Sequence, residues 1–282
     1  MTSTVVITGG TRGIGHGLAR AFLARGCRVA VCGRNAAGVE AALKSLGGGA
    51  HAVGHVADVT DRDQVAGLWT AAEGAFGRVD VWINNAGATT ARRPLWSLGP
   101  HEADGVTAVN LRGVVNGSAV AAERFLRQGS GRVWNMEGFG SDGRIMPGLS
   151  VYGASKRAVS YLTGALAADL RKEANARPHD VRALLLSPGI VVTDLLLHDY
   201  TPDEYAKARA VLNILADRVE TVTPWLADRV LADRTANGCR VAWLTRRKAA
   251  GRFAAAALRK RSVLPEALPE ASSAAQEQEG TS

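Results

Sequence analysis

The chain has few cysteines, and their spacing suggests neither a disulfide framework nor a zinc site. Its 282 residues include three, Cys27, Cys32 and Cys239, which lie far apart and form no Cys-x-x-Cys pair. Two histidines, His51 and His55, have no third metal-binding group at a suitable spacing. We therefore expect a reducing compartment, no disulfide scaffold and no metal site.

Long apolar runs and a leader segment are missing as well. No stretch approaches the roughly 18 consecutive apolar residues that a membrane-spanning helix requires. Residues 2–8 already have the composition of a β-strand, which leaves no room for a charged and apolar leader. Hydrophobic residues make up 46% of the chain, which is enough for a substantial core. These features predict a soluble, cytoplasmic protein without a targeting segment.

Acidic residues are absent from one late segment. Residues 240–261 contain eight arginines and lysines and no acidic residue, which equals the whole net charge of +8. Nucleic-acid binding is not expected, because Trp243 and Phe253 are the segment's only aromatic residues available for stacking on bases. Its apolar face is poor, so we favour a solvated extension or a subunit contact. Binding of residues 240–261 to a membrane surface is the less favoured alternative.

Short apolar, β-branched runs alternate with helix-like segments along the chain. The predicted strands are residues 4–7, 28–32, 50–57, 79–83, 132–136, 181–186 and 239–244. Strands that alternate with helices form a parallel sheet with both faces covered. We therefore predict an α/β fold of the Rossmann type, a doubly wound seven-stranded parallel sheet in a single domain. The expected division is a catalytic domain at 1–245, a basic helical extension at 246–262 and a disordered tail at 263–282.

A glycine-rich turn, Thr8-Gly9-Gly10-Thr11-Arg12-Gly13-Ile14-Gly15, follows the first strand and leads into a helix. Strand, glycine turn and helix form the context of a dinucleotide site. The glycines at 9, 13 and 15 let the backbone approach a pyrophosphate closely, and the helix N-terminus supplies free N–H groups. An ordinary glycine-rich turn is the alternative interpretation.

Basic residues stand where a dinucleotide's ribose is bound. Arg34 and Asn35 follow the second strand, at the place where an acidic residue ordinarily binds the ribose hydroxyls. Arg12 in the glycine turn would bring a second guanidinium to a 2′-phosphate. NADP(H) is therefore favoured over NAD(H), unless Arg34 is only a solvated loop residue.

Asp58, after the third strand, is either an acceptor for an adenine amino group or a turn or N-cap residue.

Asparagines mark the fourth strand and the helix after it. Asn84-Asn85-Ala86-Gly87 lies at a strand's carboxyl end, where open α/β sheets place their ligands. Asn110 lies inside an apolar helix expected at 105–128, where an asparagine competes with the backbone. It either satisfies a core carbonyl or holds a water near the site.

Residues 194–217 would form a flap whose leucines either contact a substrate or belong to the core.

Tyr152 and Lys156 lie four residues apart at the start of a predicted helix, and therefore on one helix face. A nearby positive charge favours the phenolate, so Lys156 would lower the pKa of Tyr152 from its usual value of about 10. Tyr152 would then be a proton donor for a carbonyl that is being reduced. A single Tyr-x-x-x-Lys pair is a weak signal, because such pairs also occur by chance.

Together these motifs resemble the short-chain dehydrogenase/reductase family, in the family's order and spacing, from about Thr4 to Leu244. The resemblance implies that Tyr152 is the acid/base, that Lys156 lowers its pKa and holds the nicotinamide ribose, and that Asn110 positions a water in the proton relay. Residues expected to bind the cofactor, from the motifs and the resemblance, are Gly9, Thr11, Arg12, Gly13, Ile14, Gly15, Arg34, Asn35, Asp58, Val59, Asn85, Ala86, Gly87, Tyr152, Lys156, Pro188, Gly189 and Thr193.

One departure from the family concerns a serine that hydrogen-bonds the substrate oxygen. Members usually carry it just after the fifth strand, some thirteen residues before the tyrosine, where this chain reads Glu137-Gly138-Phe139-Gly140. Ser141 is the nearest substitute, and Glu137 is a second group that would be able to point into the site. Loss of such a donor costs about two to four kcal/mol of transition-state stabilisation.

The same region is similar to the chlorophyll b reductase branch of the family, as are Val151-Tyr152-Gly153-x-x-Lys156 and Ser187-Pro188-Gly189-x-Val191-x-Thr193. That branch reduces a ring formyl group to hydroxymethyl with NADPH. The resemblance implies an NADP(H)-dependent oxidoreductase that reduces an aldehyde or ketone on a bulky small-molecule substrate to an alcohol. It also implies a homodimer or homotetramer. A non-catalytic NADP(H)-binding sensor or regulator on the same fold is the alternative.

Overall fold

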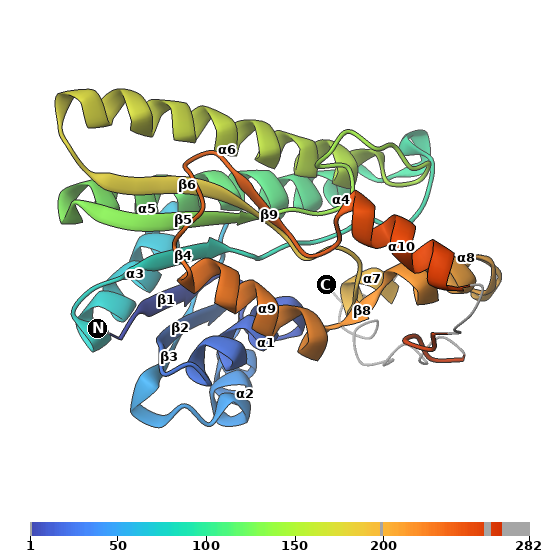
Figure 1. Cartoon of the computed structure of the whole chain (residues 1–282), viewed down its shortest axis with the longest axis horizontal. Coiled ribbons are helices and arrows are strands. Elements are labelled where there is room, and N and C mark those ends of the chain that lie inside the picture. The colour runs from blue at the N-terminus through green and yellow to red at the C-terminus, as the bar shows by residue number, and fades with distance from the viewer. Residues whose placement is uncertain (1, 198–199, 257–260, 267–282) are drawn as a thin grey trace, which may run out of the picture.

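A seven-stranded parallel sheet forms the centre of the computed structural model, which describes residues 2–197, 200–256 and 261–266 (Figure 1). Its strand order is β3-β2-β1-β4-β5-β6-β9. The strands are β1 (Thr4–Ile7), β2 (Arg28–Gly33), β3 (Ala52–Val56), β4 (Val81–Asn84), β5 (Ser130–Met136), β6 (Asp180–Ser187) and β9 (Arg240–Ala242). Two short strands, β7 (Val191–Val192) and β8 (Asp217–Arg218), pair outside the sheet. The predicted doubly wound, single-domain fold is confirmed.

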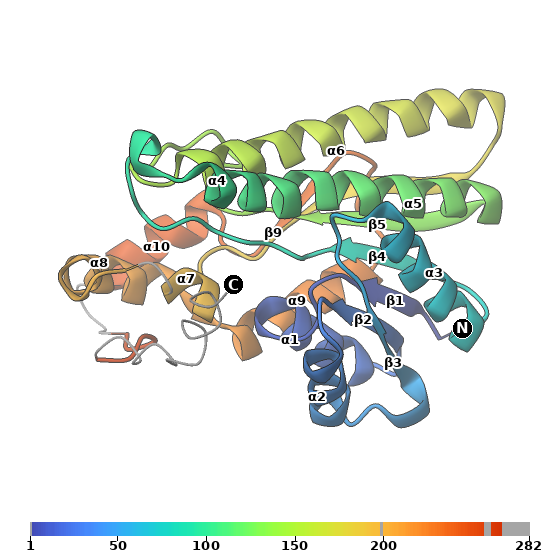
Figure 2. The ribbon, with the colours of Figure 1, turned by 180° about the vertical axis from the view of Figure 1, so that it is seen from behind.

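Helices cover both faces of the sheet (Figures 1 and 2). One face carries α1 (Gly13–Leu23), α2 (Ala36–Leu46) and α9 (Val219–Leu231), and the other carries α3 (Arg62–Phe76), α5 (Gly113–Gln128) and α6 (Ser150–Ala176). Successive strand residues point to opposite faces, so Val5 packs in one core and Val6 in the other, both fully buried. This explains why the strands are continuous apolar runs.

One short helix, η1 (Gly49–His51), directly precedes β3, at the amino ends of the strands. The others surround the carboxyl ends, and their bounds are η2 (Leu95–Ser97), α4 (Pro100–Thr107), η3 (Ala108–Arg112), α7 (Asp194–Leu197), α8 (Pro202–Leu215) and α10 (Arg246–Ala256). The segment between β4 and α5 is partly helical, and Pro100 begins α4. The helix expected from residue 105 is interrupted by the π-helical turn η3.

The C-terminal segment differs from the predicted tail. Residues 263–266 pack on the protein, and Leu264 is buried beside Tyr205 and Leu212 of α8. The prediction of disorder from residue 263 is wrong for these four residues. It rested on the overall composition of the segment, whereas a single apolar residue, Leu264, is enough to attach these residues to α8. Residues 261 and 262 of the expected helical extension are not helical. Residues 257–260 and 267–282 lie outside the described residues.

None of the helices in the described part of the chain has both the length and the apolar character needed to cross a bilayer. Within the same residues, no three His, Cys, Asp or Glu side chains gather as metal ligands would.

Candidate active site

The glycine turn after β1 has a backbone that only glycine adopts easily. Gly9 and Gly13 have φ angles of +62° and +56°, in the left-handed region. A Cβ on Gly15 would lie 2.2 Å from the Gly9 carbonyl oxygen and 2.5 Å from Asn85 Nδ2. The turn therefore closes tightly against the start of α1, whose first N–H groups have no helical partners. This arrangement fits a pyrophosphate at the helix N-terminus.

Residues after β4 are tied to this turn by a set of hydrogen bonds. The Thr8 hydroxyl accepts from the N–H groups of Asn85 and Ala86 at 3.0 and 3.1 Å. Asn85 Nδ2 donates to the carbonyls of Thr8 and Gly9, both at 3.0 Å. The sheet order changes direction between β1 and β4, which is where open α/β folds bind their ligands. The Asn85 amide therefore shapes this crevice by holding its two walls together.

The two arginines expected to meet a 2′-phosphate lie on adjacent segments. A Cβ on Gly33 would be 2.5 Å from Thr11 Cγ2, so the residues just before Arg34 and Arg12 are in contact. Both arginine side chains are exposed, and Arg12 lies 3.7 Å from the exposed carboxylate of Asp194. Asn35, next to Arg34, uses its side chain to cap α2.

Asp58 belongs to a turn and does not cap the following helix. Its Oδ1 accepts from the Thr60 N–H at 2.8 Å, and its own N–H donates to Gln64 Oε1. Asp61 caps α3, accepting from the N–H groups of the first turn. Val59, between Asp58 and Thr60, is buried against Gly113 at the start of α5. Adenine binding by Asp58 remains a prediction.

Asn110 is fully buried in η3 and makes three hydrogen bonds. Its Oδ1 accepts from the Ala88 N–H at 2.8 Å, and its Nδ2 donates to the Ala88 carbonyl at 2.9 Å and to Ser155 Oγ at 3.1 Å. Ser155 Oγ in turn donates to the Tyr152 carbonyl. The structure shows the first of the two expected roles, binding to backbone groups, and the second role, holding a water, stays a prediction. Single π-helical turns of this kind are frequent at functional sites.

Tyr152 and Lys156 meet Asn110 around two glycines. A Cβ on Gly138 would lie 2.2 Å from Tyr152 Oη and 3.1 Å from Lys156 Cε. A Cβ on Gly87 would lie 3.4 Å from Asn110 Oδ1 and 3.7 Å from Lys156 Nζ. The three predicted catalytic side chains therefore surround one region, at the carboxyl ends of β4 and β5. This is the central geometric feature of the site.

Burial shifts the pKa values of both residues on α6. The loss of hydration raises the pKa of Tyr152 to about 12 and lowers the pKa of Lys156 to about 8, with the Glu137 carboxylate opposing the second shift. The predicted lowering of the Tyr152 pKa is therefore wrong for this structure. Lys156 Nζ lies 5.9 Å from the tyrosine ring centroid and donates to the Met136 carbonyl. Desolvation of the phenol outweighs the attraction of that ammonium.

Neither substitute for the missing serine is free in this structure. Ser141 Oγ accepts from the Gly138 N–H at 3.1 Å and donates to the Lys156 carbonyl at 3.3 Å, which closes a turn. Glu137 is buried and forms an ion pair with Arg240 on β9, which also donates to Ser187 Oγ. A catalytic role for Ser141 stays a prediction.

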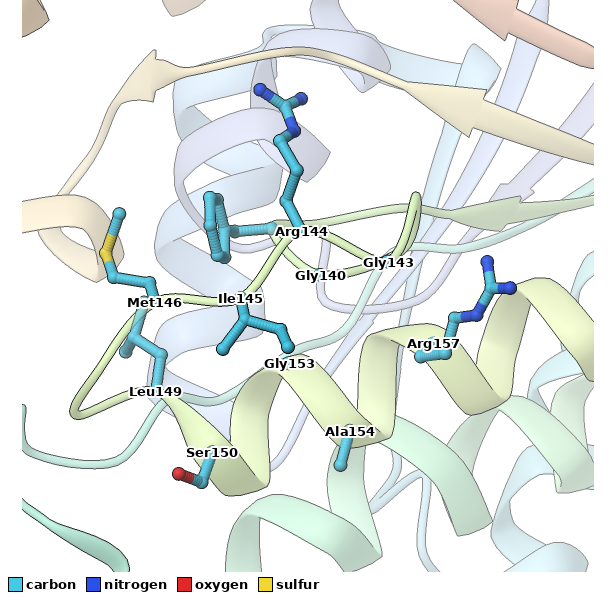
Figure 3. Close-up of a pocket in the computed structure, with 11 residues that line it drawn as sticks. Gly140, Gly143, Arg144, Ile145, Met146, Leu149, Ser150, Gly153, Ala154 and Arg157 are labelled. Carbon is cyan, nitrogen blue, oxygen red and sulfur yellow. The ribbon is translucent and has the colours of Figure 1, made fainter.

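Two hollows lie along α6. One, of about 200 Å³, lies between α6 and the loop after β5, with Ile145, Leu149 and Gly153 among its lining residues (Figure 3). The other, of about 430 Å³, is lined by residues of η2, α4, η3 and α6. Neither lining includes Tyr152 or Lys156. The second lining does include Ser155, which binds Asn110.

Comparison with known proteins identifies the family. A sequence model of the family described as short chain dehydrogenase matches residues 3–203. The chain belongs to this family. Chlorophyll(ide) b reductase NOL from Arabidopsis thaliana is 36% identical over 235 residues, which cover 81% of this chain and 65% of the relative. The probable chlorophyll(ide) b reductase NYC1 of the same plant is 32% identical over 245 residues, covering 80% and 47%. The resemblance stated from the sequence is confirmed.

Solved structures of this short-chain dehydrogenase's relatives share its fold. Levodione reductase superposes with a TM-score of 0.74 at 27% identity, covering 88% of this chain and 98% of the other. A 3-ketoacyl-(acyl-carrier-protein) reductase from Brucella melitensis, complexed with NADH, gives a TM-score of 0.72 at 26% identity, covering 86% and 96%. The family is one of oxidoreductases that use a nicotinamide cofactor.

The cytoplasmic prediction is contradicted by the plant relatives, which are named as chloroplastic. This chain spans about two thirds of the length of the NOL proteins and about half that of the NYC1 proteins. The prediction relied on an absent leader, and a sequence that matches only part of its relatives does not decide the compartment.

Sequence reasoning missed several residues that shape the site of this dehydrogenase. Thr8 lies in the glycine-rich turn and Ser155 lies between Tyr152 and Lys156, but their hydroxyls bond to segments that only the fold brings close. Arg240 was counted with the basic segment, and nothing in its neighbourhood along the chain indicates its ion pair with Glu137.

We expect the free energy of unfolding of Lys156→Met at pH 7 to be about 2 kcal/mol higher than that of the wild type. The variant should also lose activity. Below pH 8 the buried ammonium is charged in both the folded and the unfolded chain, and its desolvation destabilises the fold fully. Between about pH 8 and the usual lysine pKa of 10.5, the folded chain has lost this proton and the unfolded chain has not, so the penalty disappears as pH rises. The lost bond to Met136 offsets part of the gain.

Urea unfolding of both proteins at pH 7 and pH 10 measures this difference. Lys172→Met, an exposed change on the same helix, is the control. An unchanged or lower stability of Lys156→Met at pH 7 would show that the lysine's contacts outweigh its desolvation.

Proposed function

We propose that this short-chain dehydrogenase is an NADPH-dependent reductase that converts an aldehyde or ketone on a bulky small molecule to an alcohol. The supporting observation is the convergence of Tyr152, Lys156 and Asn110 beside the crevice between β1 and β4. Relatives named as chlorophyll(ide) b reductases support a formyl-bearing tetrapyrrole as one member of the substrate class.

The glycine turn and its neighbours fit a dinucleotide. The turn would hold the pyrophosphate, Asn85 and Ala86 would line the crevice, and Pro188, Gly189 and Thr193 would close its other side. Thr193 is suited to this place, because a Cβ on Gly13 would lie 3.6 Å from its methyl group. When bound, NADPH supplies a hydride to the carbonyl carbon.

Tyr152 would complete the reduction by proton transfer. Its Oη donates a proton to the carbonyl oxygen as the carbon accepts the hydride pair, so that C=O becomes CH–OH. A pKa of about 12 keeps this phenol protonated at neutral pH. The Lys156 ammonium lies close enough to stabilise the phenolate that remains. A proton from solvent, passed through Lys156 and the Asn110 region, would then reprotonate this phenolate.

The absence of a side chain at residue 138 supports a bulky substrate. Gly138 lies directly beside Tyr152 Oη, where a serine hydroxyl would narrow the approach to the proton donor. The cost is one hydrogen-bond donor to the substrate oxygen, which Tyr152 alone must then bind.

A second candidate is a non-catalytic NADP(H)-binding regulator on the same fold. It is favoured by one observation, that the Ser141 hydroxyl is occupied within its own turn. NADPH oxidation measured with a panel of bulky aldehydes and ketones, including formyl-bearing tetrapyrroles, separates the two candidates. Turnover supports the reductase, and tight NADPH binding without any turnover supports the regulator.

We also propose a homodimer or homotetramer that contacts through α5 and α6. Val115 on α5 and Tyr161 on α6 are 40% and 81% exposed, although both are large hydrophobic residues. Such exposed apolar side chains on adjacent helices suit a contact between copies.

Preference for NADPH is expected to depend on Arg34. Arg34→Ser should weaken NADPH binding about tenfold or more and leave NADH binding nearly unchanged, because only NADPH carries the 2′-phosphate that a guanidinium would bind. Fluorescence titration with each cofactor measures both affinities. Lys44→Ser, an exposed basic residue in the last turn of α2, is the matched control. Equal losses for the two cofactors would contradict 2′-phosphate recognition.

A further inference from the structure

A buried carboxylate joins the C-terminal segment to the rest of the fold. The Asp217 side chain on β8 is 4% exposed. It accepts from Arg252 Nη2 at 2.8 Å, from Arg261 Nη2 at 2.7 Å and from Trp243 Nε1 at 2.6 Å. Two guanidinium groups and an indole N–H thus satisfy one carboxylate, from three points along the last part of the chain.

The same two arginines bind the carboxyl end of α8. Arg252 Nη1 donates to the Leu215 carbonyl, and Arg261 donates to the carbonyls of Ile214 and Ala216. The last carbonyls of a helix have no helical partners and form the negative end of its dipole, so cationic donors there are favourable.

Residues 263–265 continue these contacts along α8. Asn213 Oδ1 accepts from the N–H groups of Val263 and Leu264 at 2.8 and 3.0 Å, and Tyr205 Oη donates to the Pro265 carbonyl at 2.8 Å. Residues 246–256 and 261–266 are called the strap below, and α7 and α8 are called the lid. Figures 1 and 2 show α10 of the strap lying beside α8.

The lid contacts both the glycine turn and the loop after β4. At its start, Asp194 pairs with Arg12 of the glycine turn. Between its two helices, the Tyr200 ring lies 4.0 Å from the guanidinium carbon of Arg92, in the loop after β4. The lid is followed by β8, the strand that carries Asp217. β8 pairs with β7, which comes just after the Pro188-Gly189 segment.

We propose that Asp217 is a positioning residue, through which the strap holds the lid over the substrate side of the site. The assignment of the lid to the substrate side rests on the proposed function, whereas the attachment of the strap to the lid does not. Arg252 and Arg261 pair with Asp217, and Arg240 pairs with Glu137. These arginines of the basic segment therefore stabilise the fold and do not point to binding of an external polyanion.

Hydrogen exchange of the full-length protein without ligand tests the attachment. In Asp217→Asn and in Arg261→Met, amides of residues 202–216 should exchange at least about tenfold faster, with the strands β4 to β6 unchanged. Arg247→Met is the control, because Arg247 is exposed on α10 and makes none of the ion pairs described in the structure. If Asp217→Asn does not fold, Arg261→Met, which keeps the carboxylate and its pair with Arg252, still gives the answer. Unchanged exchange in α8 would overturn the proposal.

Steady-state kinetics tests what the lid encloses. Arg261→Met should raise KM for the carbonyl substrate about threefold to tenfold and leave KM for the nicotinamide cofactor within about twofold. Faster exchange in α8 with an unchanged substrate KM would overturn the positioning role and leave the reductase intact. Absence of turnover in every variant, including the wild type and Arg247→Met, would instead be a failure of the proposed function.

Discussion

Tyr152→Phe is expected to lower kcat for carbonyl reduction by about 10²-fold to 10⁴-fold, while NADPH binding changes less than about twofold. The change removes one oxygen and with it the proton that the alkoxide would receive. The ring, which packs beside Gly138 and Lys156, is retained. Stopped-flow or steady-state NADPH oxidation gives kcat, and a fluorescence titration gives the cofactor affinity.

Tyr161→Phe is the matched control for this variant. Tyr161 lies on the same helix, is 81% exposed and would lose the same oxygen without touching the site. Equal activity of Tyr152→Phe and the wild type would mean that another group donates the proton, and the assignment of Tyr152 as the acid would fail.

Gly138→Ala is expected to lower kcat by about 10²-fold, although it adds only one methyl group. The new Cβ would lie 2.2 Å from Tyr152 Oη and 3.0 Å from Cζ, so the phenol must move. Displacement of a catalytic group by about an ångström is enough to cost about 10² in rate. Gly138→Ser, which supplies the hydroxyl type that most of the family uses, should also be slower for the same reason.

Gly164→Ala provides the comparison for Gly138→Ala. It lies on α6 with no atom within 4 Å of an added Cβ, so it should leave the rate unchanged. A faster Gly138→Ser would show that Tyr152 shifts easily and that the missing serine limits the natural enzyme.

The sheet and the dinucleotide crevice were predictable, because their signals are local. Val5 and Val6 belong to a β-branched run that a parallel sheet buries on both faces, and the Gly9 and Gly13 positions follow that run directly. The position of Asn110 near the site was predictable from its motif. The π-helical turn that aims its amide at Ala88 was not, because it depends on contacts with a distant loop.

The pKa of Tyr152 and the course of the C-terminal segment show why the remainder was not predictable. The spacing of Tyr152 and Lys156 indicates attraction between them, but desolvation depends on what the fold places around the phenol. Composition marked residues 240–261 as a basic stretch and the following residues as tail. The carboxylate that organises them, Asp217, looks from the sequence like any turn aspartate.

Transfer of deuterium from NADPH labelled at the nicotinamide C4 hydride position tests the central claim most directly. The substrate would be a formyl-bearing tetrapyrrole or the best aldehyde of the panel, and the product would be examined by mass spectrometry and NMR. The account predicts one deuterium on the new carbinol carbon with the wild type, and product formation reduced by the factor given above with Tyr152→Phe. NADPH binding without labelled alcohol from any substrate, and no difference between the wild type and Tyr152→Phe, would contradict it.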